Sequence, residues 1–138
     1  MPRMGLMSAA IPTSPAGARF AVSVQPQYVE DQSHPSRSEY VFAYTVVIVN
    51  AGDVTAQLIG RQWLITDALG RVEEVRGLGV VGNQPLLKPG ERFEYTSWTK
   101  LDTPHGLMQG TYFCMTEDAQ PFEAEIPAFT LARSQSLH

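Results

Sequence analysis

The apolar residues of this chain follow a period of two rather than a helical period. Residues 19–24 alternate apolar and polar side chains, and residues 40–49 are almost all β-forming. No stretch keeps an apolar period of 3.6 residues over ten positions. The pattern predicts strands, with residues 40–49 in the centre of a sheet and partly covered on both faces.

Further strands are predicted at residues 57–66, 71–75, 92–98, 110–116 and 122–131, with Gly, Pro, Asn and Asp between them. About seven short strands with turn signals every eight to twelve residues or so are typical of an all-β, antiparallel, immunoglobulin-like sandwich. We expect one domain at residues 19–132, with a flexible leader at 1–18 and a flexible tail at 133–138.

Composition narrows the classes of partner. The net charge of −4 argues against nucleic acid and anionic membranes, which attract an excess of Lys and Arg. No apolar run reaches the roughly 18 residues that span a bilayer. The apolar patch at residues 6–11 is short and followed by prolines, which leaves a targeting segment as the minor alternative. Cys114 is the single cysteine, which suits a reducing cytoplasm.

Several phrases of the sequence resemble the ApaG family. They lie at residues 40–44 (YVFAY), 57–58 (QL), 61–67 (RQWLITD), 77–85 (GLGVVGNQP), 89–97 (PGERFEYTS), 108–112 (MQGTY) and 126–129 (IPAF). Together they extend the resemblance over residues 19–131, and their shared order makes it specific. Leu78 and Trp98 depart from the pattern, because a polar and a small residue are usual there.

The resemblance implies a fibronectin type III-like sandwich with no catalytic residue and no cofactor. It also implies a bacterial gene often found beside a diadenosine-tetraphosphate hydrolase, and an association with cobalt and magnesium resistance or efflux. Related domains in eukaryotic proteins resemble interaction modules. On this basis we expect a cytoplasmic binding module for a protein partner.

The glycines of Gly77-x-Gly79-x-x-Gly82 form the most suggestive motif. Such glycines let backbone N–H groups approach a phosphate, and a following helix completes a dinucleotide site. Here Pro85 disfavours that helix, so a Rossmann site is excluded. Two readings stay open, a nest of N–H groups that binds phosphate or a glycine-rich turn.

A hairpin about residues 67–70 brings a second candidate. If Ala68 and Leu69 form its tip, opposed residue numbers sum to 137, and Arg61 faces Arg76. Opposed arginines need a negative group between them. Glu74 is one choice, and a bound nucleotide or phosphate is the other. With Gly77, Gly79 and Gly82 the two arginines would form an anion site, our alternative function.

Metal binding and catalysis have weaker support. The side chains of His34, His105, His138 and Cys114 are scattered without the spacing of a metal site, although Asp102 shares a loop with His105. Cys114 lies inside a predicted strand, where a buried thiol is usual. No motif of an activated nucleophile is present, so we expect neither a metal site nor an enzyme.

Tyr95 and Trp98 are the predicted anchors for a protein partner. Aromatic side chains bury a large area at little entropic cost, and sandwich domains recognise proteins through loops and sheet edges. The alternative is that these aromatic residues fill the core. Trp98 is the better surface candidate, because its predicted strand is ending there.

Overall fold

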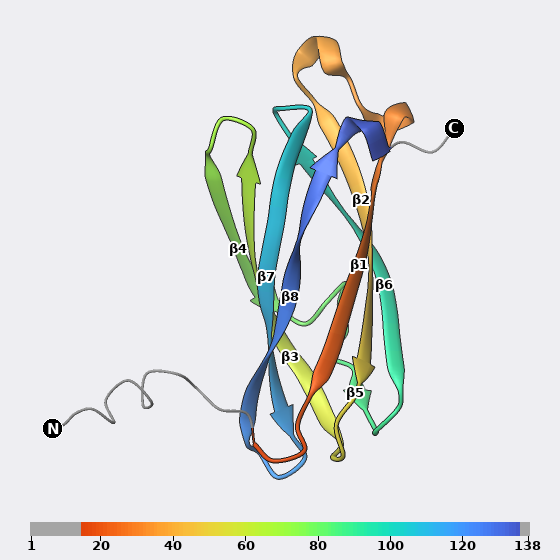
Figure 1. Cartoon of the computed structure of the whole chain (residues 1–138), viewed down its shortest axis with the longest axis vertical. Coiled ribbons are helices and arrows are strands. Elements are labelled where there is room, and N and C mark those ends of the chain that lie inside the picture. Colours follow the sequence, from red (N-terminus) through yellow and green to blue (C-terminus); the bar gives the residue numbers. More distant parts are fainter. Residues whose placement is uncertain (1–14, 136–138) are drawn as a thin grey trace, which may run out of the picture.

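The computed structural model describes residues 15–135 and confirms an antiparallel sandwich of two sheets. Sheet A has the order β1-β2-β6 and sheet B the order β4-β3-β7-β8, with the short β5 also paired to β3 (Figure 1). Each predicted strand is present. Their bounds are β1 Phe20–Tyr28, β2 Tyr40–Asn50, β3 Ala56–Asp67, β4 Val72–Leu78, β5 Leu86–Leu87, β6 Arg92–Leu101, β7 His105–Thr116 and β8 Pro121–Ala132.

Strand β2 is the middle strand of sheet A, as its nearly continuous apolar sequence predicts. Its even-numbered side chains from Phe42 to Asn50 are buried, whereas its odd-numbered ones are partly exposed. Successive side chains of a strand point to opposite faces, so the even-numbered set forms the inner face. The outer face is covered only in part.

Aromatic rings join the inner faces of the two sheets. Tyr44 of β2 contacts Trp63 of β3 with ring centroids 5.3 Å apart. Phe20 of β1 contacts Phe122 of β8 at 5.5 Å, which closes one side of the sandwich. Such pairs add about 0.5–1.5 kcal/mol each beyond the area that they bury.

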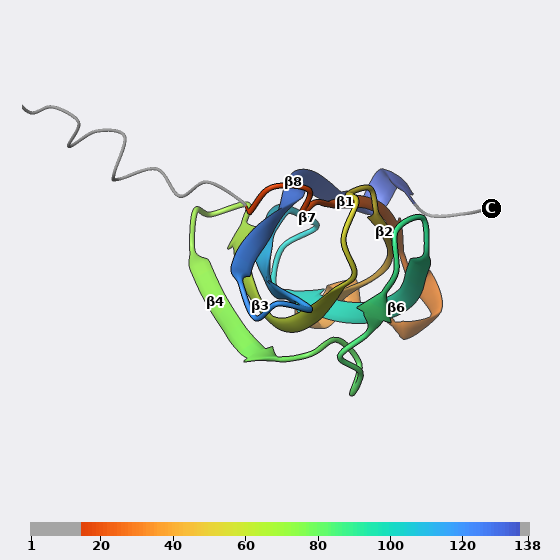
Figure 2. The same ribbon diagram turned by 90° about the horizontal axis from the view of Figure 1, so that it is seen from below.

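The other side of the sandwich stays open, because sheet B is wider than sheet A. Beyond β3, sheet B continues into β4, while sheet A ends at β6. Seen along the strands, β4 lies apart from β6 at the margin of the molecule (Figure 2). Each of these two strands therefore has one edge without a neighbouring strand among residues 15–135.

The β3–β4 hairpin differs from the expected one by a single residue. Observed partners such as Thr66 and Val72 sum to 138. Three residues rather than two form the loop, and the third, Gly70, has a φ of 82°. The Asp67 carboxylate accepts hydrogen bonds from the N–H groups of Leu69 and Arg71 at 2.9 and 3.0 Å. This arrangement is the three-residue hairpin in which glycine takes the left-handed position.

Contacts also involve the ends of the described chain. Ala18 is buried, and the Gly17 carbonyl accepts a hydrogen bond from the N–H of Asp53 at 2.7 Å. At the other end, the guanidinium of Arg133 lies 5.9 Å from the ring centre of Tyr28. The remainder of the expected leader, residues 1–14, and residues 136–138 of the tail lie outside the described residues. None of the helices among residues 15–135 is long and apolar enough to cross a membrane.

The hydroxyls of Tyr95 and Tyr112 share a hydrogen bond in the core. We expect Tyr95→Phe or Tyr112→Phe to lower the free energy of unfolding by about 1–3 kcal/mol, because each leaves one buried hydroxyl unpaired. The double variant should lose less than the sum of both. Chemical denaturation measures all three, and strictly additive losses would contradict the pairing.

Candidate binding cleft

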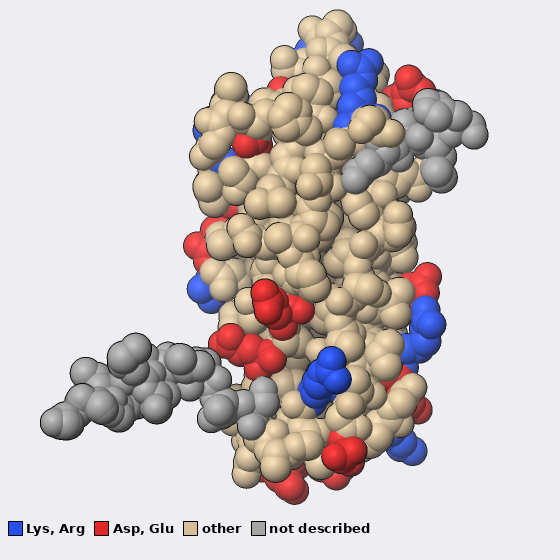
Figure 3. All heavy atoms as spheres, viewed as in Figure 1, with Lys and Arg blue, Asp and Glu red and all other residues tan. Residues whose placement is uncertain are grey.

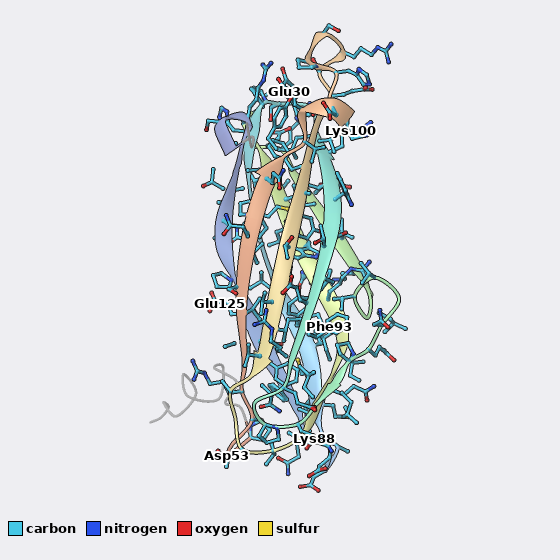
Figure 4. The ribbon with its side chains drawn as sticks, turned by 90° about the vertical axis from the view of Figure 1, so that its right-hand side faces the viewer. Glu30, Asp53, Lys88, Phe93, Lys100 and Glu125 are labelled. Atoms are coloured by element: carbon cyan, nitrogen blue, oxygen red, sulfur yellow. The ribbon has the colours of Figure 1, made fainter. Side chains whose placement is uncertain are left out.

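A cleft of about 310 Å³ lies on the open side of the sandwich, between β4 and β6. Tyr44 and Trp63 of the core form its floor, and β4 and β6 form its walls. Figure 4 shows β6 on this side, with Phe93 and Lys100 labelled toward its two ends. The lining residues are Tyr44, Arg61, Trp63, Ile65, Glu73, Val75, Ser97, Trp98, Thr99 and Lys100.

The two predicted anchors point to opposite sides of β6. Trp98 is 56% exposed and lines the cleft, as a surface anchor requires. Tyr95 is buried, and its hydroxyl bonds to that of Tyr112, so the prediction that Tyr95 is exposed to a partner is wrong. Burial raises the pKa of the Tyr95 hydroxyl, and the hydrogen bond with Tyr112 offsets part of that rise.

Arg61 reaches across β4 at the lower end of the cleft. Its Nη1 donates to the carbonyls of Leu78 and Gly79 at 3.1 and 2.9 Å. The guanidinium lies over Gly77, where a Cβ atom would come within 2.7 Å of Nη1. Gly77 is therefore required for contact with Arg61 rather than for a turn, and the carbonyls of this segment face a cation.

Arg76 lies on the opposite face of the hairpin from Arg61, so the predicted pairing of the two arginines is wrong. Arg61 is opposite Gly77, and Arg76 is opposite Gln62. Residues directly opposite each other share a face of the sheet, which separates the two arginines. Nε of Arg76 donates to Oε2 of Glu74 at 2.7 Å, and Gln62 donates to the same oxygen at 2.7 Å. The interpretation that Glu74 neutralises the arginines is therefore confirmed for Arg76 alone.

The glycine motif is built as a tight turn. The N–H of Val80 donates to the Asn83 carbonyl at 2.7 Å, and the N–H of Asn83 donates back at 2.8 Å. Val81 and Gly82 between them have φ values of 43° and 83°, as a type I′ turn requires. The N–H of Gly79 donates to Ile59 at 2.8 Å. These amides serve the fold, and with Arg76 on the far face the five residues do not gather into one anion site.

A larger hollow of about 720 Å³ lies over β7 and β8. It includes Phe113, Glu123 and Glu125, and no basic side chain lines it. Figure 3 shows the face of the molecule with β7 and β8 as mostly uncharged, with acidic groups gathered in its lower half. The hollow is lined by apolar side chains together with Gln109, Thr111 and the two glutamates, and it lacks a cation. The cleft combines the exposed Trp98 with both basic and acidic side chains, so it is the better candidate site.

The side chains considered as metal ligands do not come together within residues 15–135. No cluster of three or more His, Cys, Asp or Glu residues there could hold a metal ion. The Asp102 carboxylate lies 3.9 Å from the Arg71 guanidinium, and His138 lies outside the described residues. Cys114 is buried, and burial raises its pKa to about 12, which keeps the thiol protonated at neutral pH.

Comparison with known proteins decides the family. The sequence profile of the ApaG domain matches residues 30–116. The chain belongs to the ApaG family. Protein ApaG of Bordetella pertussis is 60% identical over 119 residues, which span 86% of this chain and 91% of the relative. Protein ApaG of Ralstonia nicotianae is 56% identical over 119 residues, spanning 86% and 96%.

A solved ApaG-like fold supports the same assignment. The crystal structure of the putative ApaA protein from Bordetella pertussis superposes with a TM-score of 0.84 at 56% identity, covering 91% of this chain and all of that one. The names of these relatives indicate no reaction. The open cleft of the ApaG sandwich and the strand edges beside it are thus the candidate sites of function.

Val81 is β-branched and has a positive φ in an exposed turn. Asn is the preferred first residue of a type I′ turn before glycine. We expect Val81→Asn to raise the free energy of unfolding by about 0.5–1 kcal/mol, since it relieves backbone strain without removing buried contacts. Denaturation with urea measures the change. A loss of stability would show that the Val81 side chain has a packing role.

Burial of Cys114 also predicts a pH dependence of stability. Its folded pKa of about 12 lies above the value of roughly 8.5 for a free thiol. The contribution of the protonated Cys114 thiol to the free energy of unfolding is therefore fully present below pH ~8.5. It declines as the pH rises from there toward 12. Thermal melting from pH 7 to 10 should show the decline, and Cys114→Ala should reduce it. Rapid labelling of the native thiol at pH 8 would contradict its burial.

Proposed function

We propose that this ApaG domain is a non-enzymatic binding module that receives an extended segment of a partner protein along β6. The supporting observation is that β6 borders an open cleft while its outer edge has no neighbouring strand among the described residues. A strand added there would become the fourth strand of sheet A and would lie over β4.

The backbone of β6 is suited to such pairing. The N–H of Asn50 donates to the carbonyl of Glu91 at 2.9 Å, which fixes the alternation along the β2–β6 ladder. Odd-numbered residues of β6 then bond to β2, and even-numbered residues direct N–H and C=O toward the open edge. The groups available to a partner strand belong to Glu94, Thr96, Trp98 and Lys100.

Side chains beside this edge supply selectivity. Trp98 stands in the middle of the row and offers a large aromatic surface to a cross-strand neighbour. Inside the cleft, Glu73 on β4 presents a carboxylate and Val75 an apolar surface. This combination fits a segment with an apolar or aromatic residue opposite Trp98 and a basic residue that points inward toward Glu73.

The proposal includes a cytoplasmic location, where a lone cysteine stays reduced. It also treats the family's association with cobalt and magnesium efflux as indirect, acting through the bound partner. The acidic net charge supports a protein partner over nucleic acid or an anionic membrane.

The test is a selection of displayed extended peptides on the full-length protein, followed by two variants of one edge residue. Thr96→Pro removes the edge N–H group and should weaken the selected peptides by about tenfold or more. Thr96→Val loses the same hydroxyl, which bonds to Thr45 at 2.8 Å, but keeps the edge N–H and should bind normally. Trp98→Ala should also weaken binding.

Nuclear magnetic resonance then locates the peptide. We expect the amide signals of Glu94, Thr96, Trp98 and Lys100 to move together when the peptide is added. Equal binding by Thr96→Pro and Thr96→Val, or shifts confined to the hollow over β7 and β8, would refute the β6 site.

A further inference from the structure

Strand β4 has a second open edge, distinct from the β6 edge, and its sequence is complementary to itself. It forms the outermost strand of sheet B and pairs only with β3 among residues 15–135. After Leu78 the chain turns back toward β5, away from this edge (Figure 2). Because sheet A ends at β6, on the other side of the cleft, no strand of sheet A blocks the approach of another β4.

The direction of the free backbone groups follows from the ladder with β3. The N–H of Asp67 donates to Arg71 at 2.9 Å, and the N–H of Gly79 donates to Ile59 at 2.8 Å. Odd-numbered residues of β4 therefore bond to β3. The even-numbered residues direct their backbone groups to the open edge, and they are Val72, Glu74, Arg76 and Leu78.

We propose that two copies of this chain associate through antiparallel pairing of β4 with β4. In the register where opposed numbers sum to 150, the even-numbered residues form hydrogen-bonded pairs. Glu74 faces Arg76 of the second copy and Arg76 faces its Glu74, so opposite charges meet twice. Val72 faces Leu78 in the same way, and these side chains are 62% and 77% exposed in one copy.

The same register also satisfies the inner face. Val75 meets its own copy on the two-fold axis, and Glu73 faces Gly77 of the second copy. The guanidinium of Arg61 lies over Gly77, so the Glu73 carboxylate reaches a cation across the interface. Within residues 15–135 of one copy, no ion pair or hydrogen bond involves this carboxylate.

No other symmetric register gives these contacts. A shift by two residues along the strand, to a sum of 148 or 152, places Glu74 against Glu74 or Arg76 against Arg76. Like charges directly opposite are destabilising in a sheet. The single favourable register therefore predicts one defined dimer with a continuous sheet B rather than open-ended aggregation.

The test uses charge reversal on the full-length chain and sedimentation velocity over a wide range of concentrations. The unmodified protein should show a monomer–dimer equilibrium. Glu74→Arg and Arg76→Glu each place like charges opposite one another twice and should raise the dimer dissociation constant by about tenfold or more. Both side chains are exposed, so we expect each variant to fold, and thermal melting checks this.

Two rescues distinguish interface loss from general damage. A mixture of Glu74→Arg with Arg76→Glu pairs opposite charges again and should form a heterodimer. The double variant Glu74→Arg/Arg76→Glu should also dimerise by itself. A protein that stays monomeric at every concentration, or a dimer that these changes leave unaffected, would overturn the proposal.

A cross-link then tests the register. Val75→Cys places two thiols across a close pair, with Cα atoms about 4.5 Å apart, and should give a disulfide-linked dimer under oxidation. Glu73→Cys is the control, since its symmetry mate lies four residues away along the strand, about 13 Å, and should not link. Equal linking of both variants would refute the register. Thr96→Pro should leave dimerisation unchanged, which separates this pairing from the proposed partner site.

Discussion

The structure depends on the packing of a three-stranded sheet against a wider one through their inner aromatic faces. Tyr44 and Trp63 hold the centre, and Phe20 and Phe122 close one side. Because these contacts fix β1 against β8, the extra strand of sheet B is left to project on the opposite side. The cleft and the two open edges that border it, those of β4 and β6, follow from that mismatch in width.

Much of the fold is readable from the sequence, because a period of two and turn residues are local signals. Every predicted strand exists, and β2 occupies the centre that its apolar run indicates. The predicted hairpin register is wrong by one residue, because the prediction places a two-residue tip where a three-residue loop forms. Asp67 and Gly70 were the signals for a three-residue loop, in which an Asp side chain accepts backbone N–H groups and glycine takes positive φ.

That single residue changes the interpretation of the site. A shift of one position moves a side chain to the other face of the sheet, so Arg61 belongs to the cleft and Arg76 to the outer surface. The prediction that Tyr95 and Trp98 both anchor a partner is wrong for Tyr95, for a related reason. Residues three apart in a strand point to opposite faces, and only contact with Tyr112 of the other sheet decides which one is buried.

Open edges are a hazard for a β-sandwich, and the two edges beside the cleft differ in the side chains that they carry. Strand β6 exposes Glu94, Trp98 and Lys100 on its outward face, and none of these side chains points into the cleft as a buried charge. On β4 a carboxylate, that of Glu73, points inward, a feature that discourages general strand pairing. An incoming strand must bring a cation to that position to offset its desolvation. The second copy brings that cation through its Arg61. Glu73 thus disfavours pairing with most strands but is compatible with pairing to a second β4.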